Sequence, residues 1–288
     1  VRLRLAGPLS PGVRLDLAAQ WLEEDGGAAW ASSGNVTGPF GGRLAGAALT
    51  DPIGDFEGRA SRTWGQVRGS LEARLGPGQL TFRLARDDYA KRFIEELDYR
   101  PGAQTFFGVP LFPDGLQPIR QPVDLDATTA ELRWQGAPWA GAGLTVGVFG
   151  QDLDRQRVDD FGPLLFGAPA PLYRTDSQQT AAFAGLSQRL GRWQVEAQAR
   201  YDQDRRRQRI FSRGTVIDRR QASFGQWQPR LGVSYAPTQN SALYVAYGEG
   251  FRSGGFNPLP PAGASWQAQF GPDTTSSLEA GVRLRGTG

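Results

Sequence analysis

Residues 243–257 have the sequence L-Y-V-A-Y-G-E-G-F-R-S-G-G-F-N. The first half places the apolar side chains of Leu243, Val245 and Tyr247 at every second position, and the second half is rich in glycine around Phe251 and Arg252. Successive side chains of a β-strand point to opposite faces of the sheet. The stretch therefore predicts a strand with one apolar face that runs into a glycine-rich loop.

The same alternation of apolar and polar residues recurs through the rest of the chain. In one segment, Trp193, Val195 and Ala197 alternate with the polar residues Gln194 and Glu196. Equivalent segments lie at residues 13–21, 67–75, 130–135, 144–151, 230–235 and 278–285. No stretch shows a comparable helical period, so the chain is expected to be all-β.

Two kinds of connection alternate between these segments. Short turns are expected at residues 7–12, 76–78, 136–141, 191–192 and 236–240, and long loops at about 25–61, 95–122, 158–173, 212–221 and 257–272. Short connections at one end and long connections at the other indicate an up-and-down antiparallel meander.

The predicted strands are about 10 to 18 residues long, whereas strands of soluble sheets usually have about five or six. A tilted strand needs about 9–11 residues to cross a membrane. Aromatic residues near the strand ends, which suit a membrane–water interface, are Trp21, Trp134, Trp193, Tyr201, Trp227 and Tyr235. About eleven strands are expected, and single-chain bacterial barrels close with an even number. We therefore predict a transmembrane antiparallel up-and-down β-barrel, present as a fragment.

Composition excludes several other classes of protein. Hydrophobic residues make up 39% of the 288 residues, and the mean hydropathy of −0.42 excludes a helical membrane protein. Cysteine and histidine are absent, which removes thiolate zinc sites, cysteine nucleophiles and the commonest general base. A soluble all-β protein that binds or acts on carbohydrate stays open as an alternative, although such folds usually have shorter strands. The formal charge of +3 and one short basic cluster at residues 205–209 predict no nucleic-acid partner.

The opening stretch also resembles a segment found in the barrels of TonB-dependent outer-membrane receptors of the siderophore-receptor type. The residues that carry this resemblance are Tyr244, Tyr247, Gly250, Phe251, Arg252, Ser253, Gly254, Gly255, Phe256 and Asn257. A second motif of the family matches at Glu279, Gly281 and Arg283, although Leu278 stands where the family often has tyrosine. The remaining strands match the family in architecture only.

The resemblance implies a barrel of about 22 strands with a plug domain folded inside it, in the bacterial outer membrane. It implies uptake of a scarce ligand, most often a ferric siderophore, with energy from the TonB–ExbB–ExbD complex delivered through the plug. Residues 1–288 would then be part of the barrel domain, with the plug domain and the C-terminal strands absent. Such a protein is not an enzyme and needs no resident metal or cofactor. A passive outer-membrane porin is the other barrel alternative.

Candidate ligand contacts are expected in the long loops and at the adjoining strand ends. They are Arg205, Arg206, Arg207, Arg209, Phe106, Phe107 and Trp266. Arginines and aromatics at the mouth of a barrel suit an anionic, partly aromatic iron chelate. Alternatively, the arginines bind the phosphates of lipopolysaccharide among the outer-membrane lipids, and the aromatics pack the loops.

Charged residues dominate the polar faces of the strands, which we expect to line the lumen. Arginines such as Arg14 and Arg68 are interleaved with acidic residues such as Asp16 and Glu72. Interleaved charges could hold a plug through salt bridges or line an aqueous pore. The acidic pairs Asp87-Asp88, Asp159-Asp160 and Asp202/Asp204 lack the spacing of a metal-binding loop and are expected to be solvated.

Overall fold

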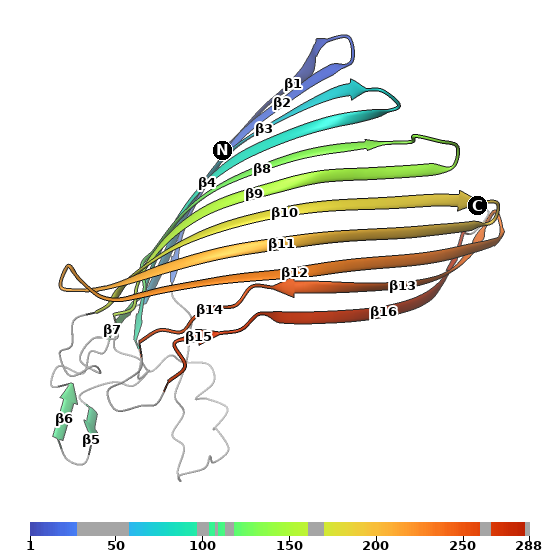
Figure 1. Ribbon diagram of the computed structural model, residues 1–288. Coiled ribbons are helices and arrows are strands. Elements are labelled where there is room, and N and C mark those ends of the chain that lie inside the picture. Colours follow the sequence, from blue (N-terminus) through green and yellow to red (C-terminus); the bar gives the residue numbers. More distant parts are fainter. Residues whose placement is uncertain are drawn as a thin grey trace, which may run out of the picture.

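The computed structural model describes residues 1–27, 58–96, 104–106, 109–112, 118–160, 170–259 and 266–285. Most of them form one curved antiparallel sheet in which each long strand pairs with the long strands before and after it along the chain (Figure 1). These strands are β1 (Arg2–Ser10), β2 (Val13–Gly27), β3 (Arg59–Leu75), β4 (Gly78–Glu96), β8 (Val123–Gly136), β9 (Ala142–Val158), β10 (Leu172–Leu190), β11 (Trp193–Ser212), β12 (Thr215–Thr238), β13 (Ser241–Arg252) and β16 (Asp273–Leu284).

The remaining strands are short. Strand β7 (Pro118–Arg120) pairs with β4, β5 (Gln104–Phe106) pairs with β6 (Val109–Phe112), and β14 (Gly255–Phe256) pairs with β15 (Gln269–Phe270). Within the described ranges, no helix has the length and apolar character needed to cross a membrane.

The topology confirms the predicted up-and-down meander of about eleven long strands. The tight turns between β1 and β2, β3 and β4, β8 and β9, β10 and β11, and β12 and β13 lie at one end of the sheet, called the turn end below, and the opposite end is called the loop end (Figure 1). Strands β1 and β16 form the two edges, and no pairing between described residues joins them. The sheet is therefore open, as expected for part of a larger barrel.

One predicted long loop is wrong. Residues 212–221 were expected to form a loop, but β11 and β12 continue to a two-residue turn at Arg213 and Gly214. Both turn residues have positive φ, 48° and 79°. Such turns match the twist of antiparallel strands and usually carry Asn-Gly or Asp-Gly. Arg-Gly lacks this signal. The many arginines around it are typical of a polar loop, which is why residues 212–221 were predicted to be one.

The sheet has an inner, concave face and an outer face of different polarity. Among the most buried side chains, Tyr173, Asp202 and Ile210 share the inner face, with exposed fractions of 2%, 1% and 0%. Large apolar side chains exposed on the outer face include Leu132, Val148, Val195, Leu231 and Leu278. Curvature crowds the side chains of the concave face and spreads those of the convex face. The apolar side chains lie on the convex face, as in the wall of a transmembrane barrel.

Aromatic pairs mark both limits of the outer apolar band. Trp193 and Tyr235 pack with ring centroids 4.6 Å apart near the turn end, and Tyr201 and Trp227 pack at 5.0 Å further along the same two strands. At about 3.3 Å per residue, Trp193 and Tyr201 lie about 26 Å apart along β11. With a strand tilt of about 40°, the band is about 20 Å high, which is close to the apolar band of outer-membrane barrels.

Four aspartates form a row across the outer face, closer to the loop end than the apolar band. Asp88 faces Asp126, Asp126 faces Asp154, and Asp154 faces Asp176 on β4, β8, β9 and β10. Like charges in direct opposition are unfavourable. The hydrogen bond with Asp88 raises the pKa of Asp126, and burial together with Asp176 raises the pKa of Asp154. Arg86, 3.0 Å from Asp126, offsets part of the repulsion at one end of the row.

The aspartate row predicts a pH-dependent stability. The pKa of Asp154 is raised in the folded state, so its ionisation costs stability as the pH rises above about 4. Asp154→Asn should raise the thermal midpoint of the full-length barrel at pH 7, by about 1 kcal/mol or less in free energy. The difference should vanish at pH 3, where the wild-type carboxyl is protonated. Melting curves in detergent at both pH values measure this.

Asp25→Asn is the control of opposite sign. The hydrogen bond from Arg59 lowers the pKa of Asp25, so its carboxylate contributes stability above about pH 4. Its removal should lower the midpoint at pH 7 and have little effect at pH 3. An Asp154→Asn shift of equal size at both pH values would contradict the repulsive row.

Candidate functional site

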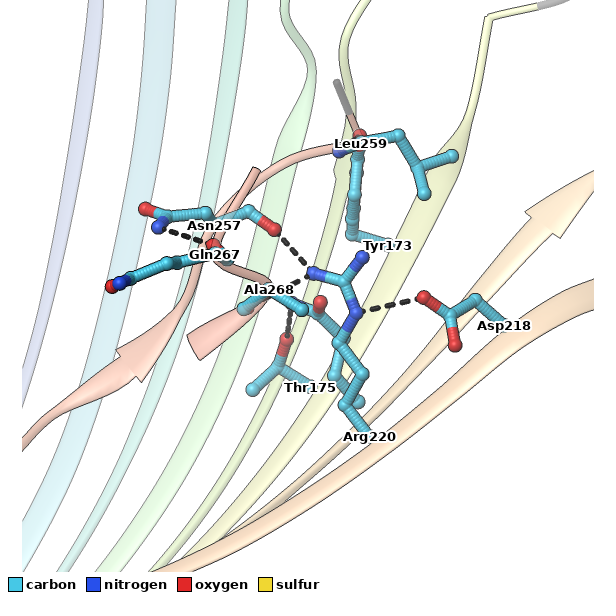
Figure 2. A network of polar contacts seen from close by, with 9 residues as sticks. Tyr173, Thr175, Asp218, Arg220, Asn257, Leu259, Gln267 and Ala268 are labelled. Atoms are coloured by element: carbon cyan, nitrogen blue, oxygen red, sulfur yellow. Dashed lines mark hydrogen bonds and ion pairs between the residues drawn. The ribbon is translucent and has the colours of Figure 1, made fainter. Parts of the chain in front are cut away.

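The inner face near the loop end carries a polar network on β10, β11 and β12 (Figure 2). Thr175, Gln208 and Arg220 lie in one row, because Thr175 pairs with Gln208 and Gln208 with Arg220. The Nε2 group of Gln208 donates to Oγ1 of Thr175 at 3.1 Å. The Arg220 side chain is 9% exposed and donates through Nε to Oδ2 of Asp218 at 2.8 Å. These contacts fix the Arg220 guanidinium over the inner face.

Arg220 holds a loop segment against that face. Residues 253–259 and 266–272, called the inner loop below, leave the direction of β13 and β16 and lie over the neighbouring strands (Figure 2). The Nη1 group of Arg220 donates to the backbone carbonyls of Asn257 and Ala268. A single buried guanidinium thus binds both halves of the inner loop.

Asn257 joins the two halves of the inner loop directly. Its backbone N–H donates to the carbonyl of Ala268 at 3.0 Å, and its Nδ2 group donates to the carbonyl of Gln267 at 2.8 Å. Short β-strands on either side, β14 and β15, continue this pairing. The last residue of the predicted family motif therefore has a structural role in the fold of the loop.

Tyr173 supports the far end of the inner loop from β10. Its hydroxyl accepts a hydrogen bond from the backbone N–H of Leu259 at 3.1 Å. Burial raises the pKa of this hydroxyl, which lies beyond the apolar band. The Arg157 guanidinium lies over the tyrosine ring at 5.1 Å from its centroid, a cation–π contact.

The two adjacent glycines of the motif allow the inner loop to pack closely. A Cβ atom at Gly254 would lie 2.6 Å from the ring of Phe224 on β12, and one at Gly255 would lie 2.6 Å from the ring of Phe270. Either distance is too short for a non-bonded carbon contact. Only glycine fits at these positions, so Gly254 and Gly255 are required by close approach within the loop and to the wall.

Three arginines lie near one another on the inner face beside this network. Arg155 and Arg157 lie on β9, and Arg206 lies on β11. Arg157 pairs with Asp159 at 2.7 Å and Arg206 with Asp204 at 2.8 Å. Arg155 has no hydrogen-bond or ion-pair partner among the described residues.

Arg155 is a partly buried charge near two like charges, Arg157 and Arg206, and one carboxylate, Asp159. Burial, with repulsion from Arg157 and Arg206, lowers the pKa of Arg155, which lies beyond the apolar band. Arginine stays protonated at neutral pH even when its pKa falls. The position therefore keeps a desolvated positive charge that an anion would stabilise.

Buried polar atoms without hydrogen-bond partners lie in the same region. They are Nε of Arg157, Oδ1 of Asp159 and Oε1 of Gln208, none of which has a partner within the described residues. Buried polar groups are nearly always satisfied in folded proteins, so these atoms leave hydrogen-bonding capacity in this region that the described residues do not use.

The expectation that Asp202 and Asp204 are solvated is wrong. They are 1% and 2% exposed on the inner face. Arg200 binds Asp202 through two nitrogens, at 2.6 and 2.8 Å, and Gln179 donates to the same carboxylate at 2.8 Å. Strand curvature and these partners bury both carboxylates. Within the described ranges, no group of three or more acidic side chains could hold a metal ion.

The predicted motif residues of β13 and β16 meet across the pair of strands. Tyr244 faces Gly281, and a Cβ atom at Gly281 would lie 2.6 Å from the tyrosine ring. The Tyr244 hydroxyl donates to Oε1 of Glu279. The glycine therefore makes room for the ring, and the glutamate binds its hydroxyl. Arg283 faces Ala242 on the adjoining strand and is exposed.

The rest of the first motif is divided between strand and loop. Tyr247 lies on the outer face of β13, where its hydroxyl donates to Glu249 at 2.6 Å. Phe251 and Arg252 end the strand opposite Thr274 and Asp273. The remaining motif residues are Gly250 in β13, Ser253 after it, and Phe256 in β14.

The predicted arginine cluster does not form a single site. Alternation along β11 places Arg206 on the inner face with Asp204, whereas Arg205, Arg207 and Arg209 point to the outer face. On the inner face, Arg206 lies with Arg155 and Arg157 of β9 and not with the other arginines of β11. Sequence reasoning missed Arg155 and Arg157, although their period-two spacing on β9 could have indicated a shared face.

The aromatic candidates for ligand contact, Phe106, Phe107 and Trp266, stay predictions. Trp266, at the start of the second half of the inner loop, is 48% exposed. The Phe106 side chain and the whole of Phe107 lie outside the described residues.

The family model described as "TonB dependent receptor-like, beta-barrel" matches residues 8–288. No curated protein sequence gives a significant match. Solved structures, however, show the same fold. The ferric yersiniabactin uptake receptor FyuA from Yersinia pestis has a TM-score of 0.71 and 15% identity, over 96% of this chain and 40% of that chain.

Two further receptors extend the comparison. The ferric-catecholate import receptor Fiu from E. coli K12, in its closed form, has a TM-score of 0.71 and 10% identity, over 98% of this chain and 48% of that chain. The copper transporter OprC has a TM-score of 0.63 and 14% identity, over 99% of this chain and 42% of that chain. The chain thus spans less than half the length of each of these proteins.

The contacts of the inner loop predict that its local stability depends on Arg220. Arg220→Gln removes a charged donor from two carbonyls, at a cost of about 2 kcal/mol in local opening free energy. Backbone amides of Asn257 and Leu259 should then exchange hydrogen roughly thirtyfold faster. Hydrogen exchange with mass spectrometry measures this. Arg219→Gln, the adjacent arginine on the opposite face, is the matched control, and equal acceleration in both variants would contradict the assignment.

Proposed function

Because the chain belongs to the family of TonB-dependent receptor β-barrels, we propose that it forms part of the wall of an outer-membrane receptor for an anionic metal chelate, specifically a ferric siderophore. In this proposal the outer apolar band contacts lipid, and the loop end faces the outside of the cell. The inner face near the loop end lines the path that the ligand takes.

The complete receptor would transport its ligand without bond chemistry. A plug domain inside a barrel of about 22 strands would close the path, and the TonB–ExbB–ExbD complex would supply the energy through that plug. Fold and family are those of transport receptors rather than enzymes. Family membership also favours a receptor over a passive porin and over a soluble carbohydrate-binding or carbohydrate-active protein.

The proposal that the ligand is an anion rests on the surroundings of Arg155. Its guanidinium has no partner within the described residues and is flanked by two further guanidinium groups on the face that lines the path. A plain structural charge in the wall would be expected to pair with a carboxylate, as Arg157 and Arg206 do. An anionic ligand would supply the missing partner through charge-assisted hydrogen bonds.

Receptors and transporters of this fold carry different metals. FyuA is a ferric yersiniabactin uptake receptor and Fiu is a ferric-catecholate import receptor, whereas OprC is a copper transporter. A chelator brings its own ligands for the metal, so the wall needs to recognise the shape and charge of the complex rather than coordinate the ion. The inner arginines favour a complex with net negative charge, such as a ferric catecholate or carboxylate.

Arg155→Gln in the full-length receptor tests this proposal. Loss of a charge-assisted contact of about 1.5–3 kcal/mol should weaken binding of an anionic chelate by roughly ten- to a hundredfold. Titration of purified receptor with a ferric tris-catecholate, ferric citrate and a neutral ferric hydroxamate measures affinity for each charge class. Only the anionic chelates should lose affinity.

Arg92→Gln is the matched control, because Arg92 lies near the loop end on the outer face and pairs with Asp124 at 2.6 Å. It should leave binding of all three chelates unchanged. Melting curves of both variants separate a ligand role from a structural one. A lower thermal midpoint for Arg155→Gln with unchanged affinity for every anionic chelate would refute the proposal, since Arg155 would then stabilise another part of the receptor.

A further inference from the structure

A second group of arginines lies on the outer face of β10, β11 and β12. Arg174, Arg209 and Arg219 lie in one row, because Arg174 pairs with Arg209 and Arg209 with Arg219. Arg205 and Arg207 follow on the same face of β11, at alternate positions. These five residues, called the outer arginine cluster below, present five positive charges on three adjacent strands.

Most of these charges are not neutralised within the described part of the chain. There, the side chains of Arg205, Arg207 and Arg219 have no hydrogen-bond or ion-pair partner. Arg209 has a 3.5 Å contact with Asp176. The Arg174 guanidinium lies over the Phe211 ring at 5.2 Å from its centroid, and its buried Nε has no partner.

Such an arrangement is unfavourable unless an anion compensates for it. Like charges directly opposite each other on neighbouring strands destabilise a sheet. The compensating groups also cannot come from the lumen, because the cluster faces away from it. The surface instead adjoins whatever surrounds the barrel.

The position of the cluster along the strands indicates what surrounds the barrel at this level. Tyr201 and Trp227 end the apolar band on the same two strands, and aromatic belts of this kind lie at the level of lipid headgroups. Arg205 lies four residues beyond Tyr201, about 13 Å along the strand, or about 10 Å along the barrel axis at a tilt of about 40°. The cluster thus begins directly above the belt, where phosphates of headgroups occur.

We propose that the outer arginine cluster binds the phosphate groups of lipid headgroups in the leaflet that surrounds the loop end. Guanidinium groups bind phosphate oxygens in pairs, and several at one site hold multiply phosphorylated headgroups. The aspartate row across β4, β8, β9 and β10 repels anions from the neighbouring surface, so binding is limited to the cluster itself. The proposal rests on the barrel standing in an outer membrane, as proposed above, but does not depend on the identity of the chelate.

The test compares the full-length receptor with its variant Arg205→Gln/Arg207→Gln/Arg219→Gln in detergent micelles. The probes are bis-phosphorylated lipid A, the same lipid without phosphates, and inorganic phosphate. Native mass spectrometry counts retained lipid, and melting curves measure stabilisation. We expect the wild type to retain the phosphorylated lipid at least tenfold more strongly than the variant, and both to retain the dephosphorylated lipid equally.

Inorganic phosphate at the same concentration should not stabilise either protein, which distinguishes a headgroup site from a site for the free ion. Arg92→Gln is the matched control, because Arg92 is an outward arginine that is already paired with Asp124. It should retain phosphorylated lipid like the wild type. Equal retention of that lipid by the triple variant and the wild type would overturn the proposal.

Chelate binding separates this inference from the proposed function. The triple variant should bind an anionic ferric chelate with wild-type affinity, because the altered side chains face away from the inner wall. If the triple variant lost chelate binding but still retained the phosphorylated lipid, the cluster would belong to the ligand site. Only the lipid inference would then be refuted. If the wild type bound no metal chelate but retained phosphorylated lipid selectively, only the proposed function would be refuted.

Discussion

Continuous antiparallel pairing fixes the face of each side chain in the long strands that the structure describes. Strand β10 pairs with β9 and β11 without a register shift from Leu172 onward. A slip of one residue would exchange the two faces of a strand. On β11 it would turn the buried carboxylates Asp202 and Asp204 to the outer face and turn Val195 inward. Because both errors are costly, the register is well determined, and the polarity of the two faces follows from it.

The same constraint divides the arginines into two groups with different surroundings. Arg206 faces the inner wall beside Arg155 and Arg157, whereas Arg205 and Arg207 face outward beyond the aromatic belt. Adjacent residues of one strand can therefore serve a ligand path and a lipid surface. Curvature adds a second difference, because it crowds the inner side chains into a buried polar network and leaves the outer side chains exposed.

The inner loop shows how a family motif and the wall depend on each other. Gly254 and Gly255 permit backbone and ring contacts that any side chain would block, and Arg220 binds the carbonyls that the loop then presents. The structure lays the second half of this motif, from Ser253 to Asn257, against the inner face. Its conformation is decided by Tyr173 and Arg220, which lie on other strands.

The sequence by itself determined the all-β class, about eleven long strands, the apolar and polar faces and the family, because a period of two residues is a local property that needs no partner. The tight turn at Arg213 and Gly214 escaped prediction, since its positive φ values were not signalled by asparagine or aspartate. The position of Arg155 beside two further guanidinium groups, the burial of Asp202 and the course of the inner loop were decided only by tertiary structure. These features depend on which strands become neighbours and on the curvature of the sheet, and neither is encoded within a single strand.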